Sequence, residues 1–175
     1  NGCSSSSTSQ INAPPSLNST ITETNQISCF GANDGSLVIN SIGGTAPYTY
    51  LWDSGVDSAT LNGLSAGTYF VTTTDANGCT ILSSSILDEP TQLNSAIIST
   101  NNVSCSGGSD GSAMVGSIGG TAPYTYLWDN TQSNNLAVGL SSGNYSVTTI
   151  DANGCLSSTN ANIYEPSAMT AIITE

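Results

Sequence analysis

The sequence predicts an all-β protein built from β-sandwich repeats in tandem, and three observations carry this prediction. Residues 41–53 read SIGGTAPYTYLWD, and residues 117–129 read the same thirteen letters, an offset of 117 − 41 = 76. Thr, Val, Ile and Tyr, which favour strands, are common, whereas the helix formers Lys, Arg and Met are absent or scarce. Turn signals recur about every ten residues between short apolar runs, which is typical of a sandwich.

Six strands are expected in the first full repeat. The Asn-Asp-Gly turn precedes the second strand, and the Gly-Gly pair separates the second from the third. Period-2 spacing puts Tyr48, Tyr50 and Trp52 on one face of the third strand. Asp-Ala-Asn-Gly forms a hairpin turn between the last two strands. The expected strands are residues 17–24, 37–42, 48–53, 59–61, 68–74 and 80–87.

Two side chains indicate the kind of sandwich. Trp52 lies on the third strand, where an immunoglobulin-like domain has its core tryptophan. The pattern Leu-x-x-Gly-x-Tyr that ends at Tyr69 has the spacing of a tyrosine corner. Trp128 and Tyr145 occupy the same places one period later. We therefore expect tandem immunoglobulin-like (PKD-like) Greek-key sandwiches, with these four side chains as structural core.

The 76-residue period also divides the chain. We expect the tail of a truncated preceding repeat, two complete immunoglobulin-like repeats, and the first strand of a truncated following repeat. The Glu-Pro pairs at 89–90 and 165–166 mark the ends of the complete repeats, because proline restricts the backbone there. The expected boundaries are 1–13, 14–90, 91–166 and 167–175.

Composition excludes several classes of function. The chain has 12 acidic residues and no Lys, Arg or His, for a formal net charge of −12. Without cations it cannot neutralise nucleic-acid phosphates or anionic membranes. Without histidine it has no ordinary general base and no Ser-His-Asp triad, so we expect no enzyme. No apolar run is long enough for membrane insertion. Five cysteines without histidine indicate disulfides and an oxidising, extracellular setting.

The carboxylates are interpreted as structural. Each acidic position of interest recurs in both repeats, and an active site has no need to be copied along a chain. We expect Asp34 and Asp75 to cap turns through Asx hydrogen bonds. A weak calcium site is conceivable from Asp34 with Glu89, and one period later from Asp110 with Glu165, although no dense oxygen-ligand cluster is present. No other metal or cofactor is expected.

The cysteines allow three periodic pairings. They are Cys29–Cys79 with Cys105–Cys155, each within a repeat; Cys79–Cys105; or Cys29–Cys155. In a Greek key, the turn near Cys29 and the turn near Cys79 lie at opposite poles, about 20 Å apart at ~3.3 Å per strand residue. A disulfide needs Cα atoms within about 7 Å. Topology therefore favours Cys29–Cys155, across two successive repeats, and the other pairings stay open.

Four motifs together resemble the SprB-type repeat of Bacteroidetes gliding-motility and cell-surface adhesins. They are Cys-x-Gly-x-x-Asp-Gly-Ser, Gly-Gly-Thr-x-Pro-Tyr-Thr-Tyr-x-Trp, Leu-x-x-Gly-x-Tyr and Asp-Ala-Asn-Gly-Cys, and they cover both complete repeats. The resemblance implies a long, secreted, outer-membrane-attached filament exported by the type IX secretion system. Asp57-Ser58-Ala59 also resembles the O-glycosylation sequon of that phylum, which makes Ser58 a candidate for modification.

The favoured function is a structural stalk segment of such a filament. Its partners would be neighbouring repeats of the same chain, other filament chains or surface polysaccharide. The alternative is a carbohydrate-binding module of a secreted polysaccharide-degrading protein, with Tyr48, Tyr50 and Trp52 as a sugar-stacking platform. A buried Trp52 would favour the stalk and an exposed one the module.

Overall fold

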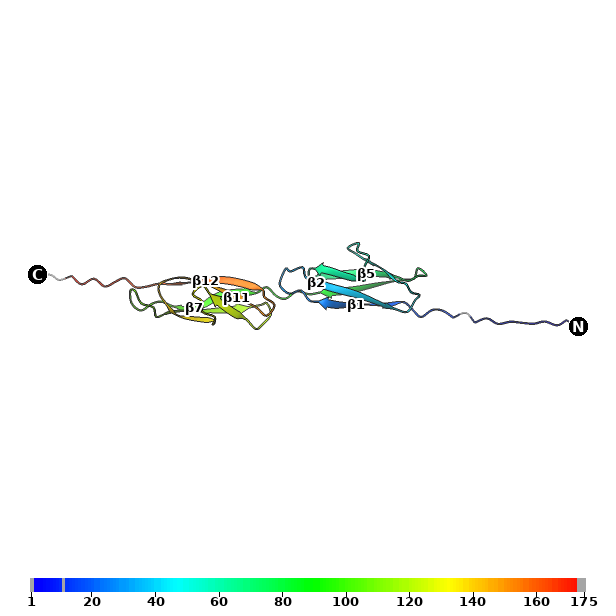
Figure 1. The fold of residues 1–175 in the computed structure, drawn as a ribbon, viewed down its shortest axis with the longest axis horizontal. Helices are drawn as coiled ribbons and strands as arrows, with labels where there is room; N and C mark the ends of the chain where they lie inside the picture. Colours follow the sequence, from blue (N-terminus) through cyan, green and yellow to red (C-terminus); the bar gives the residue numbers. More distant parts are fainter. Residues whose placement is uncertain (1, 11, 173–175) are drawn as a thin grey trace. The chain divides into compact units, whose positions relative to one another are not determined.

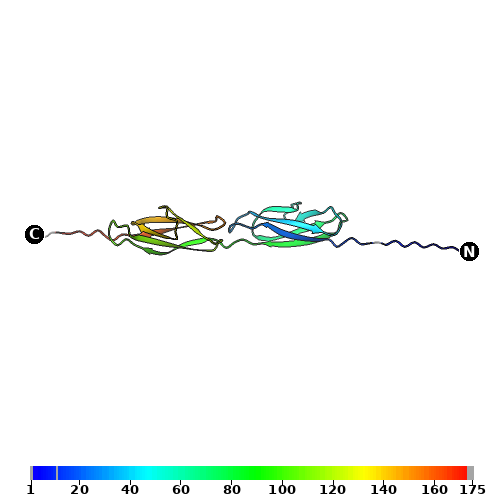
Figure 2. The ribbon, with the colours of Figure 1, turned by 60° about the horizontal axis from the view of Figure 1, so that its bottom comes forward.

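The computed structural model describes residues 2–10 and 12–172, which form two antiparallel β-sandwiches (Figure 1). Six strands make the first sandwich, and they pair in two sheets with the orders β1-β2-β4 and β3-β5-β6. Figure 2 shows the two layers of each sandwich edge-on. The bounds are β1 Asn18–Asn25, β2 Gly35–Ile42, β3 Thr49–Trp52, β4 Thr60–Leu64, β5 Gly67–Thr74 and β6 Thr80–Leu87.

The second sandwich repeats this topology strand for strand. Its sheets have the orders β10-β8-β7 and β12-β11-β9. In both sandwiches the first, second and fourth strands form one sheet and the third, fifth and sixth the other, which is the immunoglobulin-like Greek key. The expected fold class is therefore confirmed. The bounds are β7 Asn94–Asn101, β8 Gly111–Ile118, β9 Thr125–Trp128, β10 Leu136–Leu140, β11 Gly143–Ile150 and β12 Leu156–Ile163.

The core of each sandwich contains the tryptophan of its third strand. Trp52 and Trp128 are each 1% exposed. Each indole also donates its Nε1–H to a backbone carbonyl, that of Ser58 at 2.8 Å and that of Asn134 at 2.9 Å. Burial removes a large apolar area from water and leaves no unpaired donor on either ring. The other buried apolar residues of the second core are Val103, Ala113, Val115, Ala137, Leu140, Val147, Ala161 and Ile163.

The tyrosine side chains fix the turn that precedes the fifth strand. The Tyr69 hydroxyl donates to the Ser65 carbonyl oxygen at 2.7 Å, and the Tyr145 hydroxyl donates to that of Ser141 at 3.2 Å. This is the hydrogen bond of a tyrosine corner, four residues back along the chain.

The fourth strand is longer than its sequence suggests. Residues 59–61 are the expected strand, whereas β4 continues to Leu64. Gly63 has φ of +70°, and the pairing of β4 with β2 shifts register there. Glycine tolerates this conformation at little cost, so a bulge re-aims the strand and lets Leu64 be buried.

The division of the chain by its contacts differs slightly from the division by period. The first unit is Asn1–Gln26 with Asp34–Leu87, and the second is Ile27–Asn33 with Asp88–Glu175. Residues 167–172, expected to begin a strand, carry none, and neither do the described residues before β1. Residues 1, 11 and 173–175 lie outside the described part. No helix long and apolar enough to cross a membrane is found along the described residues.

The Gly-Gly pair after β2 is required by a close backbone approach. A Cβ built on Gly43, whose φ is +72°, would lie 2.0 Å from the Ser16 carbonyl oxygen. The next amide, that of Gly44, donates to the Pro15 carbonyl oxygen at 2.7 Å. A Cβ built on Gly119 would likewise lie 2.0 Å from the Gln92 carbonyl oxygen in the second sandwich. Both sandwiches therefore anchor the segment before their first strand to this pair.

Replacing Gly43 with alanine should destabilise the first sandwich by more than about 2 kcal/mol, because positive φ and a steric clash act together. Gly55→Ala is the matched control, since Gly55 has φ of +83° with nothing within 4 Å of the added Cβ. We expect it to cost only about 1–2 kcal/mol of backbone strain. Urea unfolding of both variants measures the difference, and equal losses would show that the close approach to Ser16 has no energetic weight.

Candidate functional site

The loop between β1 and β2, residues 27–33, is the first half of the candidate site. The Ala32 amide donates to the Cys29 carbonyl oxygen at 2.9 Å and closes a tight turn. Although the loop joins two strands of the first sandwich, its contacts assign it to the second unit. The cysteine in this turn is therefore held among residues of the following repeat.

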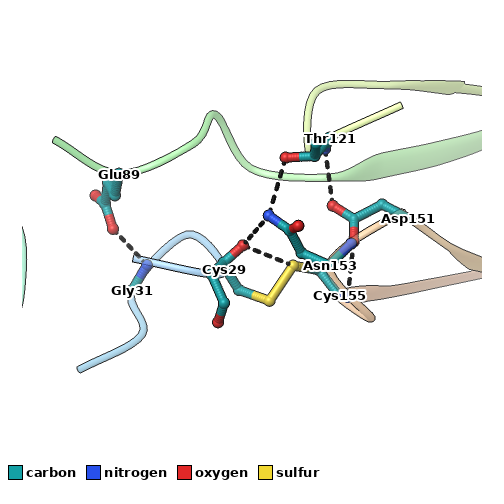
Figure 3. Close-up of a disulfide and its surroundings, with 8 residues drawn as sticks. Cys29, Gly31, Glu89, Thr121, Asp151, Asn153 and Cys155 are labelled. Carbon is teal, nitrogen blue, oxygen red and sulfur yellow. Dashed lines mark hydrogen bonds between the residues drawn. A yellow bond between two sulfur atoms is a disulfide. The ribbon is translucent and has the colours of Figure 1, made fainter. Parts of the chain in front are cut away.

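The second half is the turn 151–155 between β11 and β12, which ends at Cys155. Cys29 and Cys155 form a disulfide with an S–S distance of 2.01 Å and a Cα–Cα distance of 5.7 Å (Figure 3). Their separation along the chain is 126 residues. Of the three periodic pairings, this is the one that connects a loop of one repeat with a turn of the next.

Side chains on either side of the disulfide hold the loop in place (Figure 3). The Asn153 Nδ2 donates to the Ser28 carbonyl oxygen at 2.9 Å and to the Thr121 Oγ1 at 3.1 Å. The Glu89 carboxylate accepts a hydrogen bond from the Gly31 amide at 2.5 Å. Polar contacts thus flank the covalent bond and fix the loop's orientation.

Asp151 organises the turn that carries Cys155. Its Oδ1 accepts from the amides of Asn153 and Cys155, both at 2.9 Å. Its Oδ2 accepts from the Thr121 amide at 2.8 Å, so that one carboxylate joins two turns. Asp151 is 5% exposed and has no cation to pair with in this chain. Backbone amides take the place of a counter-ion.

These amides determine the acidity of the two turn aspartates. Burial by itself would raise the pKa of Asp151, but the hydrogen bonds from the Thr121, Cys155 and Asn153 amides outweigh it and hold the pKa below the ordinary value of 3.8. Asp75 follows the same pattern. Burial raises its pKa, but the hydrogen bonds from the Cys79, Thr45 and Asn77 amides lower it by more. Both turns therefore stabilise the ionised carboxylate.

Acid should weaken both sandwiches for this reason. A pKa that is lower in the folded than in the unfolded state gives stability that is complete above the unfolded value and is lost as the pH falls through the folded value. We expect melting temperatures that hold from neutral pH to about 4 and then decline.

Asp151→Asn provides the comparison. This variant should have a lower melting temperature than the native chain at neutral pH. The difference between the two melting temperatures should narrow as the pH falls, because protonation of Asp151 weakens the same hydrogen-bond acceptor in the native chain. A difference that stays constant down to about pH 2 would mean that ionisation of Asp151 does not stabilise the turn.

The same two structures occur a second time with free thiols. In the first sandwich, the Cys79 amide donates to Asp75 Oδ1 at 2.8 Å, as Cys155 does to Asp151. In the loop 103–109, the Gly108 amide donates to the Cys105 carbonyl oxygen at 2.9 Å, as Ala32 does to Cys29. Cys79 and Cys105 are exposed and unbonded in this chain. The loop and the turn of the site therefore keep the same hydrogen bonds where their cysteine is not in a disulfide.

Comparison with protein families identifies the repeats. Residues 21–57 and 97–133 each match the family model described as SprB repeat, with an offset of 97 − 21 = 76. Each repeat therefore contains a segment that matches the SprB repeat. Each match includes the loop cysteine, Cys29 or Cys105, and ends before the turn cysteine. The SprB repeat belongs to cell-surface repeat proteins.

Other comparisons add little. No curated protein matches the chain. Among solved structures, the crystal structure of a C-terminal 282-residue fragment of intimin, in complex with the intimin-binding domain of the translocated intimin receptor, matches at 12% identity and a TM-score of 0.42. The match covers 85% of this chain and 64% of that fragment, which is less than two thirds of its length.

Three of the four carboxylates proposed as calcium ligands accept hydrogen bonds from backbone amides. Glu89 accepts from Gly31, and Glu165 accepts from the Gly107 amide at 2.8 Å. Asp110 accepts from the Ser104 amide at 3.0 Å, and hydrogen bonds from Ser104 lower its pKa. The Asp34 carbonyl oxygen accepts from Asn25 at 2.9 Å. Over the described residues, no group of three or more His, Cys, Asp or Glu side chains is placed to hold a metal ion. Calcium binding stays a prediction.

Ser58 lies in the exposed loop between β3 and β4 of the first SprB-type repeat. Its carbonyl oxygen accepts from the Trp52 indole, and its Oγ accepts from the Thr60 amide at 3.2 Å. The hydroxyl is therefore accessible on the surface, and its glycosylation stays a prediction.

Sequence reasoning did not find Asn153 or the role of Glu89. The Asn153 side chain meets the Ser28 carbonyl across 125 residues, a distance in sequence that no local pattern reports. The recurrence of Asp-Ala-Asn-Gly-Cys in both repeats was the available signal. This pattern predicts a turn, which is present, but it does not predict that the asparagine amide donates to the loop of another repeat.

Proposed function

We propose that the chain is a stalk segment of a long, secreted cell-surface adhesin filament that serves gliding motility and surface attachment. The Cys29–Cys155 disulfide carries the proposal. With it, two successive repeats are joined both by the main chain and by a second covalent connection. In an adhesin that transmits force between a cell and a surface, a second covalent connection between repeats limits how far the chain extends under load.

The free cysteines extend the proposal to neighbouring repeats. Because Cys105 lies in the same turn as Cys29, and Cys79 in the same turn as Cys155, each is suited to bond the complementary cysteine of a further repeat. The partners would then be neighbouring repeats of the same chain, with a disulfide at every junction. Attachment to the outer membrane, export by type IX secretion, and contact with other filament chains or surface polysaccharide follow from the family resemblance as part of the same proposal.

The carbohydrate-binding alternative has less support. It needs an exposed aromatic platform, and Trp52 and Trp128 are each 1% exposed inside their sandwiches. The hydroxyl of Tyr48 donates to the Gly43 carbonyl oxygen at 2.5 Å, which ties this ring to the Gly-Gly turn. Trp52 is therefore unavailable for stacking on a sugar, and Tyr48 and Tyr50 are only half-exposed.

Attachment of cells that make the full surface protein tests the stalk function. Deleting one 76-residue repeat should leave attachment to the surface intact and shorten the filament by a constant increment in electron micrographs. The purified 175-residue chain, added in excess, should not compete for attachment. Inhibition by the purified chain would show that the segment is itself adhesive and would contradict a stalk role.

A further inference from the structure

The outer face of the β3-β5-β6 sheet carries an apolar patch on the first sandwich. Leu51 and Leu82 flank Thr72 in one row across the three strands, and Phe70 and Ile86 occupy the next two outward rows. These four apolar side chains are 42–68% exposed. The solvent face of an antiparallel sheet is ordinarily polar, and a contiguous apolar patch there indicates a binding surface.

The second sandwich replaces most of this patch. It keeps Leu127 at the position of Leu51, but the positions of the other three are taken by Ser146, Ser158 and Asn162. The remaining apolar side chains on that face, Ile150 and Leu156, lie at the strand ends beside the turn 151–155. The fold therefore does not require the apolar patch, because a homologous sandwich in the same chain forms without it.

A carboxylate in the patch also differs between the sandwiches. Asp129 accepts a hydrogen bond from the Ser146 amide at 2.9 Å. Asp53, its counterpart, accepts no hydrogen bond from any described residue, although its own amide pairs with the Phe70 carbonyl at 3.0 Å. Asp53, Phe70 and Leu51 border a shallow hollow of about 350 Å³. An unpaired acceptor thus lies beside exposed apolar side chains.

These features determine the chemistry of an occupant. The chain has no Lys, Arg or His, so a cation for Asp53 must come from another molecule. A second copy of this chain would bring only more negative charge, at −12 for each copy. Protein surfaces with exposed apolar side chains and arginine or lysine supply both elements, and arginine and aromatic side chains are enriched at protein interfaces.

We infer that the outer β3-β5-β6 face of the first sandwich is a lateral docking surface for a basic, apolar strand or helix of another protein. The cation pairs with Asp53, and apolar side chains cover Phe70, Leu51 and Leu82. The inference goes beyond the stalk function and does not depend on it, because it concerns the side of one sandwich and not the connection between repeats.

Titration of the full oxidised chain with an eight-residue peptide of alternating leucine and lysine tests the surface, followed by amide NMR shifts. We expect shifts concentrated at residues 51–53, 70–72 and 82–86. Phe70→Ser, which installs the residue of the second sandwich, should weaken binding about tenfold or more. Asp53→Asn should weaken it as well, whereas Glu23→Gln, the same charge change on the opposite sheet, should not.

Several results would overturn the inference. Equal shifts on both sandwiches, or equal losses from Asp53→Asn and Glu23→Gln, would indicate non-specific attraction to an acidic chain. A leucine–serine peptide that binds as well as the lysine peptide would remove the need for a cation. Shifts produced at this face by a neutral polysaccharide such as dextran, but not by the peptide, would assign it to a sugar. Self-association in sedimentation velocity that Phe70→Ser abolishes would assign it to a second copy.

Discussion

Pulled from its two ends, the oxidised chain should lengthen far less than the reduced chain. The Cys29–Cys155 disulfide closes a loop of 126 residues, and the chain inside that loop bears no tension while the bond is intact. At roughly 3.6 Å per fully extended residue, the bond withholds about 450 Å of contour length. Only residues before Cys29 and after Cys155 remain on the force path, including β1 and β12.

Single-molecule force spectroscopy of the full chain between handle domains measures this difference. Cys155→Ser should release both sandwiches as full-length unfolding events under conditions in which the native chain shows none. The double variant Cys79→Ser, Cys105→Ser is the matched control, because it removes exposed thiols and leaves the disulfide in place. Full-length unfolding of both sandwiches in the oxidised control would exclude the disulfide as the element that bears the load.

A longer array would show the same property in stronger form. If every junction carries the equivalent disulfide, force passes along the shortest series of covalent bonds. This path enters a repeat through the disulfide at its turn cysteine, follows the main chain to the loop cysteine of the next repeat, and leaves through the disulfide there. From Cys79 to Cys105 that path is 105 − 79 = 26 residues, and it consists mainly of β6 and β7. Strands are already extended at ~3.3 Å per residue, so unfolding a core adds little length to this path. We therefore expect the filament to keep its length under load.

Trp128→Ala should cost the second sandwich about 3–5 kcal/mol, a large part of the stability of a small domain. The loss combines a cavity in the core with an unpaired Asn134 carbonyl oxygen. Leu127→Ala is the control, because the adjacent Leu127 is 53% exposed and should change stability by less than about 0.5 kcal/mol.

Urea unfolding of Trp128→Ala separates the two sandwiches. Its remaining tryptophan, Trp52, reports the first sandwich by fluorescence, and circular dichroism reports both. We expect an early transition in circular dichroism that the fluorescence of Trp52 does not follow. Equal losses in Trp128→Ala and Leu127→Ala would mean that the indole is not the centre of the core.

The sandwich fold was accessible from sequence because its signals are local. The alternation around Trp52 and the six-residue pattern that ends at Tyr69 each lie within a short stretch, and the period of 76 is visible as an exact repeat of thirteen residues. The bulge at Gly63 could not be predicted from the sequence, because a single glycine within a strand pattern does not indicate where the pairing of two strands shifts register.

The site was accessible only in outline. The proximity of Cys29 to Cys155 could be predicted, because it follows from the end of the sandwich at which the Greek-key topology places each of the two turns. The contacts of Glu89 with Gly31 and of Asn153 with Ser28 join segments far apart in sequence and follow no periodic rule. Phe70 was likewise invisible as a surface residue, because a strand with Val71 and Phe70 in succession offers apolar side chains to both faces.

Disulfide mapping of the native, non-reduced 175-residue chain tests the central claim most directly. Pepsin digestion at acidic pH suits this chain, since trypsin finds no Lys or Arg to cleave and acid suppresses thiol exchange. We expect mass spectrometry to find a linked peptide pair that contains Cys29 and Cys155, with Cys79 and Cys105 as free thiols. A linked pair that contains Cys29 and Cys79 would close the first repeat on itself and contradict a covalent connection between successive repeats.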